Sequence, residues 1–199
     1  MMLDAATLAA ALPRWCAGLH AAAPELNALD GRLGDADLGA TLDKCATMVE
    51  QALPELPATL EGIFRRTAQA TAKASGSSFG TLLTVALMSC AKRCAGIDSL
   101  DREELAAMLA DVVATLAARG GASLGDKTVL DGLHAVHVAL AASPEGADLR
   151  RVASDAVRAA LDAFRDKPNR IGRARMFADK TIGMDDPGMV ALQRMVDSL

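Results

Sequence analysis

The chain has 199 residues, of which 51% are apolar and only 3% aromatic, and its formal net charge is −4. This length fits one domain with a single core, spanning residues 1–199, and the acidic balance excludes the basic surface that nucleic-acid binding requires. No apolar run is long enough to cross a membrane, and Asp4 lies where a secretion signal would be basic, so we expect a cytoplasmic protein with no membrane partner.

Apolar residues recur at helical spacing along the chain and predict eight helices separated by short breakers. Alanine and leucine carry most of the apolar content and favour helices, whereas the residues that favour strands are scarce. The first helix is expected to end before Pro24. The expected helices cover about residues 4–22, 37–53, 57–73, 74–93, 100–119, 125–142, 147–165 and 187–199. We therefore predict one all-α domain of mostly antiparallel neighbours, with no strand.

The cysteines and histidines give little sign of a metal site. The four cysteines form no CxxC pair and lack histidine partners at zinc spacing, so we expect them to be small buried residues. His134 and His137 are three positions apart on an expected helix, but no carboxylate accompanies them, and ordinary helix positions are the better interpretation.

The stretch at 30–39 places three carboxylates, Asp30, Asp35 and Asp37, within eight positions. Like charges this close repel one another unless a cation lies among them. We expect the two intervening glycines to supply the positive φ that folds the loop, so that the carboxylates face one centre. Mg²⁺ held by carboxylates and substrate phosphates is the common use of such a site. The alternative is a solvated acidic loop that caps the next helix.

Three further segments suit the phosphates of a nucleotide. The helix expected at 37–53 begins beside the acidic loop, where free N–H groups favour an anion. Residues 74–80, A-S-G-S-S-F-G, offer backbone and hydroxyl donors, or else a serine-rich cap with glycines for close packing. Residues 166–188 form a long irregular stretch with three glycines and with cations that include Arg170, Arg173, Arg175 and Lys180, which predicts a lid. The G-x-x-x-x-G-K-[ST] motif and a Rossmann turn are absent, so any nucleotide site has another design.

Four motifs occur along the chain: L-D-G-R-L-G-D-A-D-L-G at 29–39, A-S-G-S-S-F-G at 74–80, G-D-K-T-V-L-D at 125–131, and G-R-A-R at 172–175 followed by D-D-P-G at 185–188. In this combination and order they resemble the DhaL family, the nucleotide-binding subunit or C-terminal domain of dihydroxyacetone kinases. The resemblance covers essentially the whole chain. It implies an eight-helix antiparallel barrel with a nucleotide site at one mouth.

The resemblance also implies an activity and its residues. Asp30, Asp35 and Asp37 match the ligands of two Mg²⁺ ions, which bind the phosphates of ATP or ADP while a phosphoryl group passes to a small keto-sugar alcohol. The positions that match nucleotide contacts of the family are Leu38, Gly39, Thr41, Ser75, Gly76, Gly120, Val129, Arg173, Asp186, Pro187 and Gly188.

Partners follow from the same resemblance. The family holds its keto substrate on a separate DhaK subunit or domain through a histidine, and nothing in this chain corresponds to it. A DhaK-like partner is therefore expected. The phosphoryl donor is either ATP that exchanges or a permanently bound ADP that a phosphotransferase-system partner recharges.

The chain departs from the family pattern at two positions. Leu38 lies where the family usually has histidine, and a leucine side chain donates no hydrogen bond to a phosphate or ribose. Lys73 replaces a glycine, and it either adds a phosphate contact or crowds the site. These changes suggest a divergent member with another sugar substrate.

Three hypotheses result. The first is a kinase subunit, and the second is a catalytically impaired nucleotide-sensing interaction module. The third is an all-α scaffold with an acidic loop and no ligand. The intact aspartate triad argues against the scaffold, because a scaffold gains nothing from three carboxylates in one turn.

Overall fold

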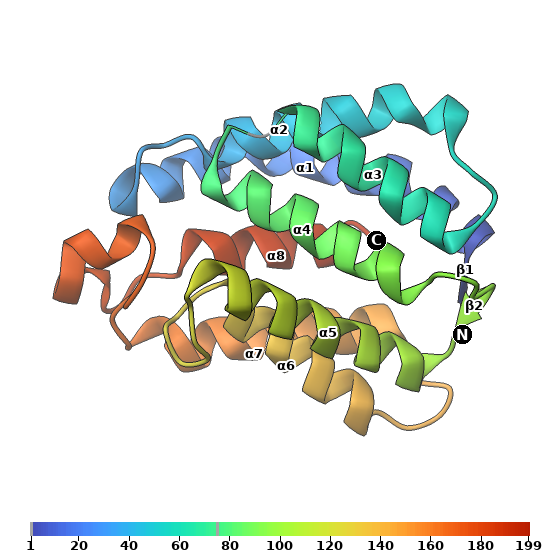
Figure 1. Ribbon diagram of the computed structural model, residues 1–199. Coiled ribbons are helices and arrows are strands. Elements are labelled where there is room, and N and C mark those ends of the chain that lie inside the picture. Colours follow the sequence, from blue (N-terminus) through green and yellow to red (C-terminus); the bar gives the residue numbers. More distant parts are fainter. Residues whose placement is uncertain (1, 75) are drawn as a thin grey trace.

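Eight α-helices dominate the part of the chain described by a computed structural model, residues 2–74 and 76–199 (Figure 1). They are α1 (Ala5–Leu33), α2 (Leu38–Ala52), α3 (Leu60–Ala74), α4 (Ser78–Arg93), α5 (Arg102–Gly120), α6 (Val129–Ala142), α7 (Leu149–Arg165) and α8 (Pro187–Asp197). Two 3₁₀ segments, η1 (Leu53–Glu55) and η2 (Arg173–Thr181), follow α2 and α7. The all-α class and the eight helices are confirmed.

The helices form a closed ring. Each packs against the next in the chain, and α1 also packs against α8. Because neighbours run antiparallel, the connections α1–α2, α3–α4, α5–α6 and α7–α8 all lie at one end of the barrel, which we call the mouth (Figure 1). The helices α2, α4, α6 and α8 therefore begin at the mouth, and their N-terminal partial positive charges converge there.

Helix α1 is longer than its sequence indicates. It continues through Pro24 to Leu33, so the prediction that it ends before Pro24 is wrong. A proline inside a helix costs one backbone hydrogen bond, and Pro24 lies on the exposed face of α1. Burial of Leu26 and Leu33 beyond it offsets that loss. As a result, Asp30 lies in the last turn of a helix and not in a free loop.

Two short strands are an exception to the helical prediction. β1 (Leu3–Asp4) pairs antiparallel with β2 (Ser99–Leu100), with Leu3 opposite Leu100. Leu100 is buried, and the Asp4 side chain accepts a hydrogen bond from the Thr7 N–H at 2.8 Å to cap α1. This pairing fastens the start of the chain to the α4–α5 connection, at the end opposite the mouth (Figure 1).

The segment between α7 and α8 is more ordered than an irregular lid. It contains η2, a nine-residue 3₁₀ segment with a kink at Ala178, where φ is 46°. We call residues 166–186 the arm. Its middle is exposed to solvent, whereas Asn169, Thr181 and Asp186 near its two ends are buried.

Candidate metal and phosphate site

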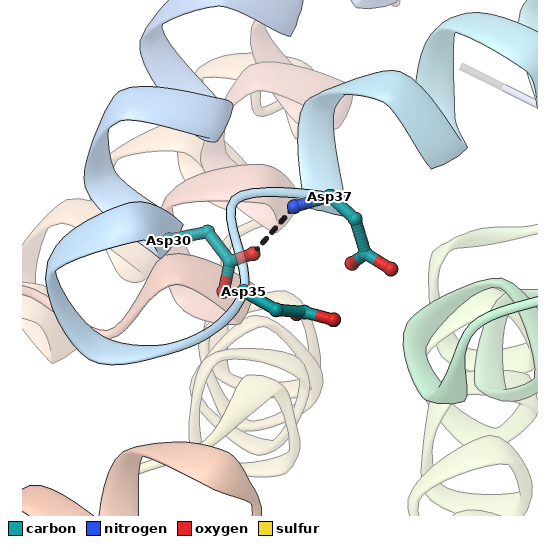
Figure 2. Close-up of side chains that lie close together, drawn as sticks. All are labelled: Asp30, Asp35 and Asp37. Atoms are coloured by element: carbon teal, nitrogen blue, oxygen red, sulfur yellow. Dashed lines mark hydrogen bonds between the residues drawn. The ribbon is translucent and has the colours of Figure 1, made fainter.

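The three predicted aspartates meet at the mouth. Asp30 comes from the last turn of α1, Asp35 from the connection, and Asp37 from the N-cap of α2 (Figure 2). One oxygen from each carboxylate lies within 4.8 Å of the other two. In the part of the chain that the structure describes, no other group of three histidine, cysteine or acidic side chains has this geometry. Three carboxylates at this separation suit a hard divalent cation such as Mg²⁺.

The backbone builds this cluster differently from the prediction. Gly34 has φ of −156°, and Gly31 lies inside α1, so neither glycine supplies a positive φ and that expectation is wrong. Ala36 does so instead, with φ of 61°. Gly34 has a steric role, since a Cβ there would lie 2.4 Å from Oδ1 of Asp30. The left-handed residue between Asp35 and Asp37 turns the chain so that both face the centre.

Asp30 also organises the start of α2. Its Oδ2 accepts a hydrogen bond from the Asp37 N–H at 3.0 Å (Figure 2) and another from the Leu38 N–H at 3.3 Å. The Asp37 side chain makes no capping bond, although it occupies the N-cap. The capping interpretation of the acidic stretch therefore holds for Asp30, whereas Asp37 directs its carboxylate to the cluster.

Asn27 is a residue that sequence reasoning missed. Its Oδ1 accepts a hydrogen bond from the Ala40 N–H at 3.0 Å and so satisfies another donor of the first turn of α2. Gly39 allows this close approach, because a Cβ there would lie 1.9 Å from the Ala23 carbonyl oxygen. Asn27 lies one turn before Asp30, and its role becomes visible only once α1 is known to continue past Pro24.

The charge at the mouth is partly compensated by the arm. Arg173, near the start of η2, forms an ion pair with Asp35. Both side chains are about half exposed, 57% for Arg173 and 41% for Asp35, so solvent screens the pair and its net contribution to stability is small. A cation that is held weakly beside a carboxylate cluster can turn toward an anionic ligand at low cost.

The remaining candidate positions divide into two groups. Gly76, Gly120 and Val129 lie at or beside helix ends at the mouth, whereas Ser75 lies outside the described residues. The side chains of Leu38 and Thr41 are buried, at 5% and 7% exposure. The N–H groups of Leu38 and Thr41 already donate to Oδ2 of Asp30 and to the Asp37 carbonyl, so a phosphate contact at this helix start is left to the backbone of Gly39.

Asp186, Pro187 and Gly188 form the start of α8, where Asp186 and Pro187 are buried. Oδ1 of Asp186 accepts from the Met189 N–H at 2.9 Å, and Oδ2 accepts from Nδ2 of Asn169 at 2.8 Å. Burial raises the pKa of Asp186 to about 6, against the opposing effect of these hydrogen bonds and of Lys127. Each oxygen of this buried carboxylate therefore has a hydrogen-bond partner within the protein.

The two departures noted in the sequence have different surroundings. Leu38 packs into the core. Lys73 lines a cavity of about 290 Å³ between α2 and α3, with Lys44, Thr47 and Met48. Lys44 and Lys73 thus contribute two cationic residues to the lining of the same cavity.

The four cysteines and the pair His134 and His137 have structural surroundings. All four cysteines are unpaired and buried, as expected, and burial raises the pKa of the Cys16 and Cys90 thiols to about 12. The rings of His134 and His137 lie 5.9 Å apart, and Nδ1 of His137 bonds to the Ala106 carbonyl at 2.9 Å. None of the helices among the described residues is long and apolar enough to cross a membrane.

The structure defines a class: an antiparallel all-α barrel with a carboxylate cluster at its mouth. Residues 32–199 match the family model of the DAK2 domain. The chain thus belongs to the DAK2 domain family, and the resemblance to DhaL proteins is confirmed.

Relatives and solved structures agree with this assignment. The chain is 34% identical over 191 residues to human triokinase/FMN cyclase, covering 92% of this chain and 33% of that protein. It is 28% identical over 179 residues to the Escherichia coli PEP-dependent dihydroxyacetone kinase, ADP-binding subunit DhaL, covering 87% of this chain and 85% of the subunit. The chain therefore spans about a third of the human protein but most of the bacterial subunit.

The dihydroxyacetone kinase of C. freundii has the same fold. Its crystal structure in complex with AMP-PNP and Mg²⁺ superposes with a TM-score of 0.75 at 26% identity, over 97% of this chain and 33% of that one. The native form superposes with a TM-score of 0.77 at 24% identity. The barrel corresponds to one third of that kinase.

Proposed function

We propose that residues 1–199 form one Mg²⁺-dependent, nucleotide-binding, phosphoryl-transfer domain of a kinase for dihydroxyacetone or a related keto sugar. The observation that carries this proposal is the convergence of Asp30, Asp35 and Asp37 at the mouth, with one oxygen of each within 4.8 Å of the others. Membership of the DAK2 family supports it, as does the AMP-PNP and Mg²⁺ complex of the C. freundii kinase.

The three carboxylates fit magnesium, and we assign Asp30, Asp35 and Asp37 as the ligands of two Mg²⁺ ions, as the family pattern implies. Asp30 is held in place by the two N–H groups that donate to it. Bound Mg²⁺ supplies charge compensation for the phosphate oxygens during transfer. Arg173 adds an exposed cation from the arm, and the converging starts of α2, α4, α6 and α8 favour an anion at the mouth. We assign the nucleotide to the backbone at Gly39 and Gly76 and to the start of α8.

The acceptor and the donor require partners. The E. coli relative is an ADP-binding subunit of a PEP-dependent kinase, whereas the human relative is a longer chain. We propose a DhaK-like subunit or domain that holds the keto substrate, with either exchanging ATP or a bound ADP recharged by a phosphotransferase-system donor. The nature of the donor determines whether the nucleotide leaves the site.

Titration calorimetry with MgADP tests the metal site. Asp35→Asn removes one metal ligand at an exposed position and leaves the packing intact, so we expect nucleotide affinity to fall at least about 100-fold with an unchanged circular dichroism spectrum. Glu145→Gln is the control, because Glu145 is exposed in the α6–α7 connection at the far end of the barrel. Equal affinity in the wild type and Asp35→Asn would refute the assignment of the aspartates.

Leu38 favours a second candidate, a nucleotide-sensing module without turnover, because its buried leucine side chain donates no hydrogen bond to a ligand. Two measurements separate the candidates. Denaturing the purified protein and assaying released ADP reports tight binding, which favours the phosphotransferase-linked subunit. Phosphorylation of dihydroxyacetone after adding a DhaK subunit reports turnover, and its absence beside intact MgADP binding supports the sensing module.

A further inference from the structure

Lys127 of the G-D-K-T-V-L-D motif does not face the mouth. Its side chain is fully buried, with 0% exposure, and its backbone has φ of 62°. Its Nζ donates three hydrogen bonds, to the carbonyl oxygens of Arg165 at 3.1 Å, Lys167 at 2.7 Å and Thr181 at 2.9 Å. An ammonium has three N–H donors, so each one has an acceptor within the protein.

These three carbonyls belong to the two ends of the arm. Arg165 and Lys167 lie where the arm leaves α7, and Thr181 lies at the end of η2. One buried ammonium therefore connects the beginning of the arm, beside α7, with the end of η2. The Gly183 N–H also donates to the Arg165 carbonyl at 2.9 Å, so a backbone hydrogen bond connects the same two ends of the arm.

Asn169 extends the same junction to α6 and α8. Its Nδ2 donates to the Lys127 carbonyl at 2.9 Å and to Oδ2 of Asp186 at 2.8 Å, and its N–H donates to Oγ1 of Thr181 at 2.9 Å. The Arg170 N–H donates to the Asp126 carbonyl at 3.1 Å. The base of the arm, which we define as Lys127, Asn169, Thr181 and Asp186, is thus a buried polar network.

The rest of the arm depends on this base. Its middle is exposed, with Met176 at 82%, and few of its side chains are buried. A segment with so little apolar burial has little stability of its own, so its position follows from its two fixed ends. Arg173, which pairs with Asp35, lies between those ends.

We propose that Lys127 is a positioning residue, whose buried ammonium fixes both ends of the arm and thereby holds Arg173 over the aspartates of the mouth. The proposal rests on the proposed function where it concerns nucleotide, but the fixing of the arm itself does not. Burial lowers the pKa of Lys127, while the nearby carboxylates of Asp186, Asp185 and Asp166 favour the charged form.

Lys127→Met tests the proposal, because methionine keeps most of the stem and removes the donors. Lys180→Met is the matched control, since it removes the same charge from an exposed position on the same arm. In Lys127→Met we expect hydrogen exchange of the Asn169, Arg170 and Gly183 amides to accelerate on the order of 100-fold, with unchanged exchange in α2 and α3. Unchanged protection of these three amides would overturn the proposal.

Two binding measurements separate positioning from general damage. In Lys127→Met we expect MgADP affinity to fall about tenfold, as for the loss of one charge-assisted contact, while affinity for Mn²⁺ alone is retained because the three aspartates remain in place. Loss of both affinities overturns positioning in favour of a folding role. If the wild type itself binds no MgADP, the proposed function fails, and amide exchange still decides the role of Lys127.

Asn169→Ala covers the case in which Lys127→Met does not fold. It removes the side-chain bonds to the Lys127 carbonyl and to Asp186 but leaves the ammonium in place. We expect the same faster exchange confined to the arm. If the arm amides of Asn169→Ala exchange as slowly as in the wild type, the base of the arm does not hold the arm in place and the proposal is wrong.

Discussion

The mouth and the base of the arm are both built from charged residues, but they use them in opposite ways. At the mouth, three carboxylates of like sign are partly exposed and lie close together, with one weakly held arginine as counter-charge. At the base, Lys127, Asn169 and Asp186 are buried, and the Lys127 ammonium and both oxygens of Asp186 have hydrogen-bond partners within the protein. Charge without a matching internal partner indicates a ligand, whereas charge with one indicates structure.

Replacing one asparagine by alanine, first at the base of the arm and then at the mouth, gives the largest expected difference in stability between the two regions. Asn169→Ala removes the buried donor to the Lys127 carbonyl and to Oδ2 of Asp186, so we expect the free energy of unfolding to fall by about 3 kcal/mol. Asn27→Ala at the mouth removes a cap from α2 in partly exposed surroundings and costs about 1 kcal/mol. Urea denaturation of both variants measures the difference. Equal losses would mean that burial does not distinguish the two regions.

The pH dependence of stability tests the base of the arm separately from the mouth. The pKa of Asp186 rises from 3.8 to about 6 on folding, so between these values only the folded state holds the proton. This group therefore makes the free energy of unfolding decrease as pH rises from about 4 to about 6, by up to about 3 kcal/mol. Asp4 and Glu25, whose pKa values are lowered on folding, act in the opposite direction.

Asp186→Asn separates these contributions, because the difference between wild type and variant cancels the other carboxylates. We expect the stability of the wild type relative to Asp186→Asn to decline across pH 4–6 and to be constant above pH 7. A flat difference across the whole range would show that the buried carboxyl keeps an ordinary pKa. Urea denaturation at six or more pH values supplies the curve.

Within the mouth, the aspartates themselves should differ in the absence of metal. Asp30 accepts two N–H groups at the start of α2, so Asp30→Ala is expected to destabilise the fold by about 1 kcal/mol. Asp35→Ala loses only an exposed ion pair and relieves repulsion, so its effect is expected within about 0.5 kcal/mol of zero. Thermal unfolding in EDTA measures both. A large loss in Asp35→Ala would mean that the Arg173 pair is structural.

The smallest effect concerns the backbone of the mouth. Ala36 has φ of 61°, a conformation that glycine adopts without a steric cost. We expect Ala36→Gly to raise the free energy of unfolding by about 0.5 kcal/mol, after the greater entropy of glycine in the unfolded chain is subtracted. Denaturant titration at high precision checks the sign. A loss of stability would mean that the surrounding contacts already relieve the strain.

Sequence reasoning recovered what is local in the chain. The helix count and the aspartate cluster were predictable because their signals lie within a few residues of one another. The end of α1 was not, because whether Pro24 breaks a helix depends on packing beyond it. The role of Lys127 was not, because its acceptors lie 38, 40 and 54 positions away. The motif at 125–131 was recognised in the sequence, but only the structure shows that its Lys127 bonds to both ends of the arm.

The connections between helices alternate between the two ends of the barrel, so those at the end opposite the mouth can accept an insertion without disturbing the site. The α2–α3, α4–α5 and α6–α7 connections lie away from the mouth (Figure 1). The α6–α7 turn, where Glu145 is exposed and Gly146 has φ of 80°, is therefore a place to insert an affinity tag or fluorescent reporter. Such an insertion leaves both ends of the arm and all three aspartates untouched, so occupancy of the mouth can be followed from the opposite face of the molecule.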